Sequence, residues 1–277
     1  MSRLAQQFAL LKKQRRAALI PYVMAGDPAP WVTVPLLHAL VDAGANVLEL
    51  GVPFSDPMAD GPVIQRAAER ALKHRITLSG VLETVRQFRA KDSMTPVVLM
   101  GYLNPIESMG YVTFAERAAA AGVDGALTVD LPPEEAQELL AALRGRAVDP
   151  IFLLAPTSGP GRIQAVVRAA AGFIYYVSLR GVTGASHLDL REVSDRIANI
   201  RRYTDLPLGV GFGISGPEVA ANVASFADAV VVGSAVVSRM EEQSADPEKL
   251  LLEVPAFIAS LRAAMDATHA ANVRTAG

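Results

Sequence analysis

Residues Val47–Val52 read VLELGV, an almost continuous apolar run that contains one carboxylate, and this pattern decides the fold. Seven other short apolar runs, each followed by a loop, repeat it along the chain. Because their apolar residues are continuous and do not alternate, the runs are typical of strands covered on both faces of a parallel sheet. The other runs are Leu19–Ala25, Pro96–Tyr102, Gly125–Val129, Ile151–Ala155, Phe173–Ser178, Leu208–Phe212 and Ala229–Gly233.

Amphipathic stretches with helical spacing separate these expected strands. Strands that alternate with helices predict an α/β fold, and eight βα units that close on themselves make a TIM (β/α)8 barrel, here with additional helices. The 277 residues suit two domains or one such barrel, but no serine- and glycine-rich linker divides the chain. We therefore expect a single barrel domain over residues 1–277. The expected helices are Trp31–Ala43, Gln65–Leu72, Leu78–Arg89, Phe114–Ala121, Pro133–Leu143, Gly161–Ala170, Leu188–Arg202, Pro217–Ala224 and Pro247–Ala267.

The composition excludes several classes of protein. Hydrophobic residues make up 51% of the chain and charged residues 19%, which is enough for a globular core. The net charge of −2 gives no electrostatic case for binding nucleic acid or an anionic membrane. The chain has no cysteine, so disulfides and thiolate sites are excluded, as fits the cytoplasm. No apolar run is long enough to span a membrane, and the first residues do not resemble a signal peptide.

Two carboxylates lie where a barrel places its active site, at the carboxyl ends of the strands. Glu49 stands inside a buried apolar run, which is costly without a partner or a function. It is either an acid/base group or part of an ion pair in the barrel interior or at its rim. Asp60, in the loop after the same run, either caps the next helix or completes an acid/base pair with Glu49.

Three glycine-rich loops follow the last three expected strands and predict a phosphate site. They are Gly181–Gly184, Gly211–Gly216 and Gly233–Ala235. Glycines expose backbone N–H groups, and the loops after strands seven and eight are the usual phosphate site of this fold. The alternative is that these glycines only form turns. No lysine lies between Lys91 and Lys249, so the phosphate would be held by backbone and hydroxyl groups.

Lysine and histidine positions narrow the mechanism further. No lysine lies on an expected strand, which disfavours a Schiff-base mechanism. The histidines are scattered and read as ordinary surface or helix residues, so we expect no metal site; a carboxylate site from Glu49, Asp56 and Asp60 is the alternative. A lyase of this kind needs a substrate that supplies its own electron sink, such as a heteroaromatic ring. The lysines of the chain are Lys12, Lys13, Lys73, Lys91 and Lys249, and its histidines are His38, His74, His187 and His269.

The stretch from Leu48 to Pro62, LELGVPFSDPMADGP, resembles the signature of the tryptophan synthase α-subunit family. Further matches occur in the family's order and extend the resemblance over almost the whole chain. They are Met24-Ala25-Gly26-Asp27-Pro28, Asn104-Pro105, Asp130-Leu131-Pro132, Gly181-Val182-Thr183-Gly184-Ala185 and Gly211-Phe212-Gly213-Ile214-Ser215.

The resemblance implies cleavage of indole-3-glycerol phosphate to indole and glyceraldehyde 3-phosphate. It implies that Glu49 moves protons between the glycerol hydroxyl and indole C3, and that Asp60 accepts a hydrogen bond from the ring N–H. Tyr175 matches a tyrosine that lines the site, with barrel packing as its alternative role. Substrate-binding positions are Tyr22, Met100, Leu127, Thr183 and Phe212, and phosphate-binding positions are Gly184, Gly213, Ile214, Gly233 and Ser234.

The resemblance also implies a partner, the β subunit of an αββα assembly. The cofactor pyridoxal phosphate (PLP) belongs to that partner, and no cofactor is expected in this chain. Residues 181–187 are expected to form a mobile lid, and Arg180 beside it to lie in solvent. Interface candidates are Pro53, Asp56, Asn104, Asp130, Pro132 and Pro133, where the alternative is that the prolines only stiffen loops.

Three other functions fit parts of this pattern. A non-catalytic activator of the β subunit is one, although Glu49 and Asp60 argue against it. A lyase that releases indole without a partner is another. The third is a different phosphosugar barrel enzyme, such as an isomerase.

Overall fold

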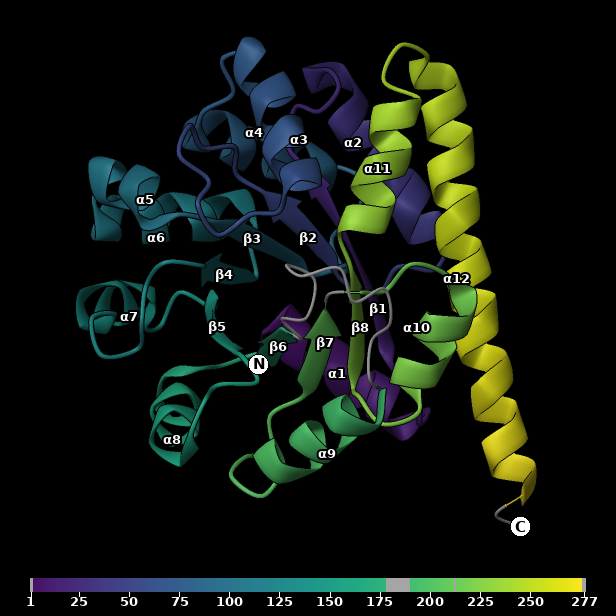
Figure 1. Ribbon diagram of the computed structural model, residues 1–277. Coiled ribbons are helices and arrows are strands. Elements are labelled where there is room, and N and C mark those ends of the chain that lie inside the picture. The colour runs from purple at the N-terminus through teal and green to yellow at the C-terminus, as the bar shows by residue number, and fades with distance from the viewer. Residues whose placement is uncertain (1, 178–189, 212, 276–277) are drawn as a thin grey trace.

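The computed structural model describes residues 2–177, 190–211 and 213–275, with side chains to residue 268, and contains a closed parallel barrel (Figure 1). Its strands pair in chain order, and the last closes against the first, so the predicted TIM barrel is confirmed. Each expected strand agrees with the observed one to within two residues at either end. The strands are β1 (Ala18–Met24), β2 (Leu48–Gly51), β3 (Val97–Gly101), β4 (Gly125–Thr128), β5 (Asp149–Leu154), β6 (Ile174–Val177), β7 (Leu208–Gly211) and β8 (Ala229–Val232).

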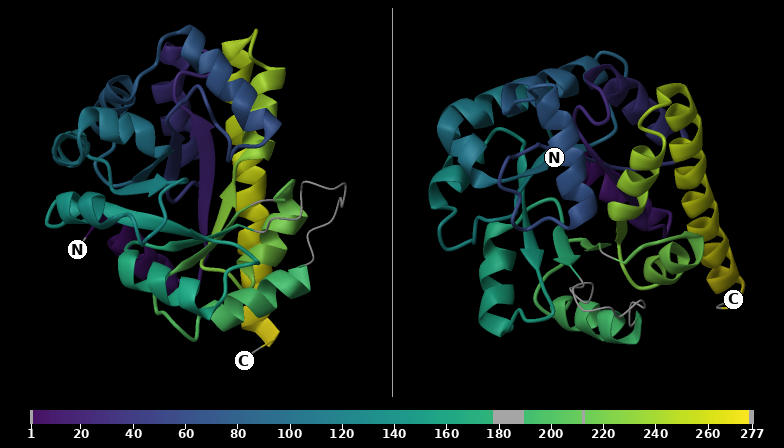
Figure 2. Two further views of the ribbon diagram at one scale, coloured as in Figure 1. Left: turned by 60° about the vertical axis from the view of Figure 1, so that its left-hand side comes forward. Right: turned by 45° about the horizontal axis from the view of Figure 1, so that its top comes forward.

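Helices surround the barrel, and the long α12 runs along one side of it in every view (Figure 2). The helices α1, α5 and α11 were not expected, α7 begins four residues later than expected, and α12 extends to Thr275. No helix in the described part of the chain has the length and apolarity to cross a membrane. The helices are α1 (Arg3–Lys13), α2 (Pro30–Asp42), α3 (Pro62–Lys73), α4 (Leu78–Arg89), α5 (Leu103–Met109), α6 (Tyr111–Ala121), α7 (Gln137–Leu143), α8 (Pro160–Ala169), α9 (Leu190–Ile200), α10 (Pro217–Ala224), α11 (Ser234–Glu242) and α12 (Pro247–Thr275).

The strands are buried on both faces because two separate layers of apolar side chains cover them. Outward-facing residues such as Leu48 and Leu50 pack under the surrounding helices. Inward-facing residues such as Ile20, Val98 and Val231 fill the barrel itself. This double covering is why the sequence shows continuous and not alternating apolar runs.

Helix α1 closes the amino-terminal end of the barrel. Its apolar residues Leu4, Phe8 and Leu11 belong to the interior core, and the Phe8 ring lies 5.7 Å from that of Phe173. The Ser2 hydroxyl caps the helix by accepting a hydrogen bond from the backbone N–H of Ala5. The apolar residues of α1 thus fill the barrel at the end where its strands begin.

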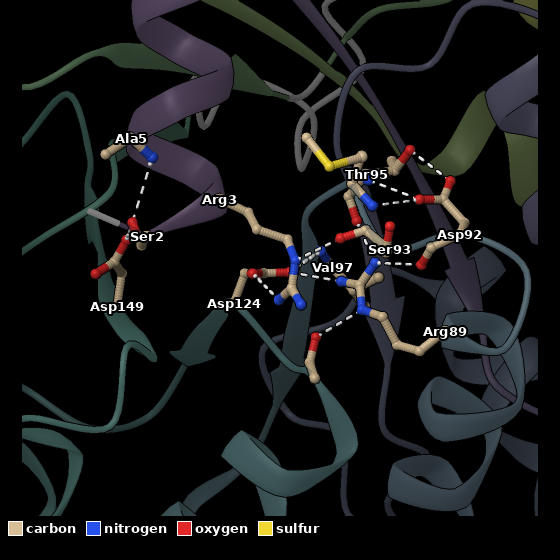
Figure 3. Close-up of polar contacts among 12 residues, drawn as sticks. Ser2, Arg3, Ala5, Arg89, Asp92, Ser93, Thr95, Val97, Asp124 and Asp149 are labelled. Carbon is tan, nitrogen blue, oxygen red and sulfur yellow. Dashed lines mark hydrogen bonds and ion pairs between the residues drawn. The ribbon is translucent and has the colours of Figure 1, made fainter.

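The carboxylate of Asp124 joins α1 and α4 to the start of β3 (Figure 3). It is buried, with 1% of the residue exposed. It accepts hydrogen bonds from Arg3 Nη1 (2.9 Å), Arg89 Nη2 (2.6 Å) and the backbone N–H of Val97 (2.8 Å). A buried carboxylate with this many charged donors ties three segments together.

We expect Asp124→Ala to lower the free energy of unfolding by about 3–5 kcal/mol, because it removes one partner of a buried ion pair and leaves the arginines uncompensated. Urea unfolding followed by circular dichroism measures this change. The matched control is Glu83→Ala, which breaks the exposed pair with Arg86 on α4 and is expected to have a much smaller effect. Equal losses in the two variants would contradict the role given to Asp124.

Candidate active site

A cavity of about 380 Å³ opens at the carboxyl ends of the strands, within the size range of small-molecule sites. Residues from β1, β2, β3, β6 and β8 form its floor, and the starts of α3 and α11 form part of its wall. It is lined by Tyr22, Glu49, Ala59, Asp60, Gly61, Ile64, Met100, Tyr175, Gly213, Ile214, Ser215, Val231, Gly233, Ser234, Ala235 and Ser238.

Glu49 lies on the cavity floor with 1% of the residue exposed. It pairs in register with Tyr22 of β1, and neither carboxyl oxygen has a hydrogen-bond partner among the described residues. Burial, and then the charge of Asp60, raise the pKa of Glu49 to about 8. The group therefore carries a proton near neutral pH, and the alternative of an ion pair at Glu49 is not seen among the described residues. A buried carboxyl of this kind can donate a proton and take one back.

Asp60 lies on the cavity wall just before α3. Burial raises its pKa to about 6, while a hydrogen bond from the Tyr102 side chain opposes the rise. Gly61, not Asp60, is the residue that precedes the first turn of α3, and no side chain caps this helix. The alternative role of Asp60 as a helix cap is therefore not what the structure shows. Near neutral pH its carboxylate is ionised and faces the same space as Glu49.

Two tyrosines of the cavity, Tyr22 and Tyr175, each lie over a glycine of the neighbouring strand. A β-carbon at Gly51 would collide with the Tyr22 hydroxyl, and one at Gly211 with the Tyr175 hydroxyl. Burial is the main cause that raises the pKa of both phenols well above the usual value, so both rings stay neutral. The bare backbone at these two glycines makes room for the rings.

Residues 213–215, after β7, and 233–235, at the start of α11, meet at one side of the cavity, and we call them the glycine cradle. The first N–H groups of a helix have no partner within it and attract anions. The Ser234 and Ser238 side chains are one turn apart on α11, and both residues line the cavity. The cradle therefore suits an anion such as a phosphate.

The structure brings together most of the predicted site residues, but not all. Met100 lines the cavity, whereas Leu127 packs with Val98 and Ile151 in the barrel interior and does not line it. The predictions for Thr183, Gly184, Phe212, Arg180 and the lid 181–187 lie outside the described residues. Sequence reasoning missed Ala59, Gly61, Ile64, Val231 and Ser238 in the lining and Tyr102 as the partner of Asp60.

The predicted interface residues lie around the same end of the barrel with different exposure. Asp56, Asn104 and Asp130 are exposed, and Pro132 is partly buried. Asp130 also accepts a hydrogen bond from the backbone N–H of Leu103 (2.8 Å), which fixes the start of α5. Pro53 and Pro133 are buried within this chain.

The carboxylate metal site does not form in the described structure. Asp56 is exposed and is not among the cavity-lining residues, so the third ligand of that alternative is missing. Among the described residues, no three metal-binding side chains gather at one point. His38 lies against the Phe88 ring at 4.7 Å, and His74 contacts the Pro28 carbonyl at 2.9 Å, both outside the cavity lining.

The buried Glu49 carboxyl predicts a pH-dependent stability. Because its pKa is about 8 in the folded chain and near 4.5 in the unfolded chain, the folded state binds more protons between these values. The free energy of unfolding should therefore fall as the pH rises from about 4.5 to about 8. Urea unfolding across this range, compared with the variant Glu49→Gln, measures the contribution, and the variant should lose less stability. Parallel pH curves for the two proteins would contradict the raised pKa.

Comparisons with known proteins agree with this arrangement. The family model described as tryptophan synthase alpha chain matches residues 8–266. The tryptophan synthase alpha chain of Nitrosococcus oceani is 60% identical over 269 residues, which cover 97% of this chain and 99% of that protein. The crystal structure of tryptophan synthase subunit alpha from Legionella pneumophila superposes with a TM-score of 0.90 at 48% identity, covering 96% and 99% of the two chains. A Mycobacterium tuberculosis tryptophan synthase structure matches with a TM-score of 0.86 at 38% identity, covering 95% and 98%. The chain therefore belongs to the tryptophan synthase alpha chain family.

Proposed function

We propose that the chain cleaves indole-3-glycerol phosphate into indole and glyceraldehyde 3-phosphate, as the alpha subunit of a tryptophan synthase. One observation carries the proposal: Glu49 and Asp60, whose pKa values are raised to about 8 and about 6, share one cavity with the glycine cradle. An acid and a base with separated pKa values are suited to proton transfer at neutral pH. The substrate has the matching parts, an aromatic N–H, a glycerol chain and a phosphate.

In this proposal Glu49 carries the proton transfers. Its carboxyl proton goes to indole C3, which converts the ring into an indolenine. The resulting carboxylate takes the proton of the adjacent glycerol hydroxyl, and the carbon–carbon bond breaks as that oxygen becomes a carbonyl. The bonding electrons pass into the indolenine, so the ring is the electron sink and neither a lysine nor a metal is required.

Asp60 and the aromatic walls bind the other end of the substrate. The Asp60 carboxylate accepts a hydrogen bond from the ring N–H and stabilises the positive charge that develops when the ring is protonated. Tyr22, Met100 and Tyr175 line the same cavity and supply surface for the indole ring. For Thr183 and Phe212 the assignment stays a prediction from the resemblance.

The phosphate occupies the glycine cradle in the proposal, with Gly213, Ile214, Gly233 and Ser234 nearest to it. Support comes from the open start of α11, where backbone N–H groups and the helix dipole favour an anion. No lysine lies on a strand or in the cavity lining, so hydrogen bonds and not an ammonium group hold the charge. Gly184 stays a prediction from the resemblance.

The family also supports a β-subunit partner, which would bind PLP, so that this chain carries no cofactor of its own. The exposed Asp56, Asn104 and Asp130, with Pro132 beside them, are the surface that we propose for this contact. Pro53 and Pro133 would support the loops from within, because both are buried. We also propose the cytoplasm as the compartment, on the cysteine-free sequence, which cell fractionation tests.

The deciding experiment measures indole release from indole-3-glycerol phosphate by the purified chain, alone and with a β subunit, with and without EDTA. We expect release that the β subunit increases and EDTA leaves unchanged. No release under either condition would favour a non-catalytic activator. Full turnover by the isolated chain would favour a lyase without a partner, and loss of activity with EDTA would restore a metal mechanism.

A further inference from the structure

Four charged side chains connect α3, α11 and the loop after β1, and we call Asp27, Arg66, Arg70 and Glu241 the helix clamp. Arg70 donates from Nε and Nη2 to the two oxygens of Asp27, at 2.6 and 2.9 Å, and from Nη1 to Glu241 at 2.7 Å. Arg66 donates to both oxygens of Glu241 at 2.7 Å. The Asp27 side chain is fully buried, while those of Arg70 and Glu241 are 18% and 29% exposed.

The helix clamp lies outside the cavity. None of its four residues lines the cavity. Yet α3 begins two residues after Asp60, and α11 begins with Ser234 of the glycine cradle. The two helices pack against each other. Helix α3 follows β2 and α11 follows β8, and Asp27 lies in the loop after β1, the strand between β2 and β8. The clamp therefore joins the helices that carry two separate parts of the site.

Each of the two helices connects the helix clamp to a residue at the cavity. Arg70 is eight residues from the start of α3, or about 12 Å along a helix, and Glu241 is about 10 Å from Ser234. The Gln65 amide on α3 donates to the Asp60 backbone carbonyl at 2.9 Å, so Asp60 moves with the helix. A bidentate arginine fixes angle as well as distance, which a single point charge does not.

We propose that Arg70 and Glu241 are positioning residues that fix the distance between Asp60 and the glycine cradle. The inference rests on the proposed function, in which one substrate binds at both places. A ligand that spans two subsites gains affinity only when their separation matches its length, and a mismatch removes that gain without altering either subsite. The clamp is therefore expected to affect two-ended ligands selectively.

The experiment compares three probes in the full chain by calorimetry: indole, glycerol 3-phosphate, and an unreactive analogue with indole joined to a propyl phosphate chain. The main variant is Glu241→Gln, which removes the charge and one of the two acceptor oxygens that join α11 to Arg66 and Arg70 and leaves the buried Asp27–Arg70 pair intact. Arg70→Met removes the charge and every hydrogen bond that Arg70 donates in the clamp, so it should have a larger effect. Arg70→Lys keeps the charge but loses the bidentate geometry of the guanidinium. Arg86→Met on α4, which breaks an exposed pair with Glu83, is the matched control.

For Glu241→Gln we expect the analogue to bind about tenfold more weakly, with the dissociation constants of the two fragments nearly unchanged. The KM for the substrate should rise more than kcat falls, and Arg70→Lys should give values between those of the wild type and Arg70→Met. Unchanged analogue binding in folded Glu241→Gln, or fragment affinities that fall in parallel, would overturn the inference. A wild-type chain that neither binds the analogue nor cleaves substrate would instead refute the proposed function.

Discussion

Replacing Glu49 with glutamine is expected to lower the rate of indole formation by about 10⁴-fold, while the substrate still binds. Positioned proton transfer contributes about 10²–10⁴-fold, and Glu49 serves both the ring carbon and the glycerol hydroxyl, which places it at the top of that range. Glutamine keeps the shape of the side chain but neither donates nor accepts the proton that moves. The loss corresponds to about 5.5 kcal/mol of activation free energy.

Single-turnover kinetics and calorimetry with the propyl phosphate analogue separate chemistry from binding in this variant. Glu49→Asp is the matched control, because it keeps the acid but withdraws it by one methylene, and a displacement of this size costs about 10²-fold. Both variants should fold, since the Glu49 oxygens have no hydrogen-bond partner to lose among the described residues. Turnover of Glu49→Gln within tenfold of the wild type would refute the proton transfer role.

Replacing Asp60 with asparagine is expected to lower kcat/KM by about 10²–10³-fold. The asparagine oxygen still accepts a hydrogen bond from the ring N–H, so the variant removes the charge and keeps the contact. The effect should fall on kcat more than on KM, because the positive charge on the ring exists only after protonation. Steady-state kinetics at pH 7 measure it, with the exposed Glu83→Gln on α4 as control.

The pH profile gives a second, independent test of Asp60. Burial raises its pKa to about 6, so activity that needs its ionised form should rise as the pH increases through about 6. This acidic limb should be absent from the profile of Asp60→Asn. If the limb persists in the variant, a different group is responsible for it and the charge role is wrong.

The barrel was predictable because each strand is buried on both faces and leaves a continuous apolar run. The same logic gave β8 but not α11, because residues 229–237 form one apolar run in which β8 ends at Val232 and α11 begins at Ser234. Short apolar runs do not distinguish a strand from a buried helix, and only Gly233 marks the break. Helix α5 was missed because it has seven residues and contains Pro105, which is too short for a periodic pattern.

Site residues were predictable where they lie at or just after the carboxyl end of a strand, because that end of the barrel forms the site. Glu49 and the glycine loops follow from the rule that barrel sites lie at the carboxyl ends of strands. The contact of Tyr102 with Asp60 depends on the path of a loop that local sequence does not specify. Leu127 pairs in register with Met100 but does not line the cavity, and its contact with the substrate stays a prediction.

The glycine beneath Tyr22 limits the routes by which this sequence can evolve. Because a β-carbon at Gly51 occupies the position of the Tyr22 ring, a side chain at 51 is compatible only with a smaller residue at 22. A change at 51 before one at 22 is therefore expected to destabilise the chain, whereas a change at 22 relieves the collision in advance. Related chains that carry a side chain at the position of Gly51 should therefore lack an aromatic ring at the position of Tyr22.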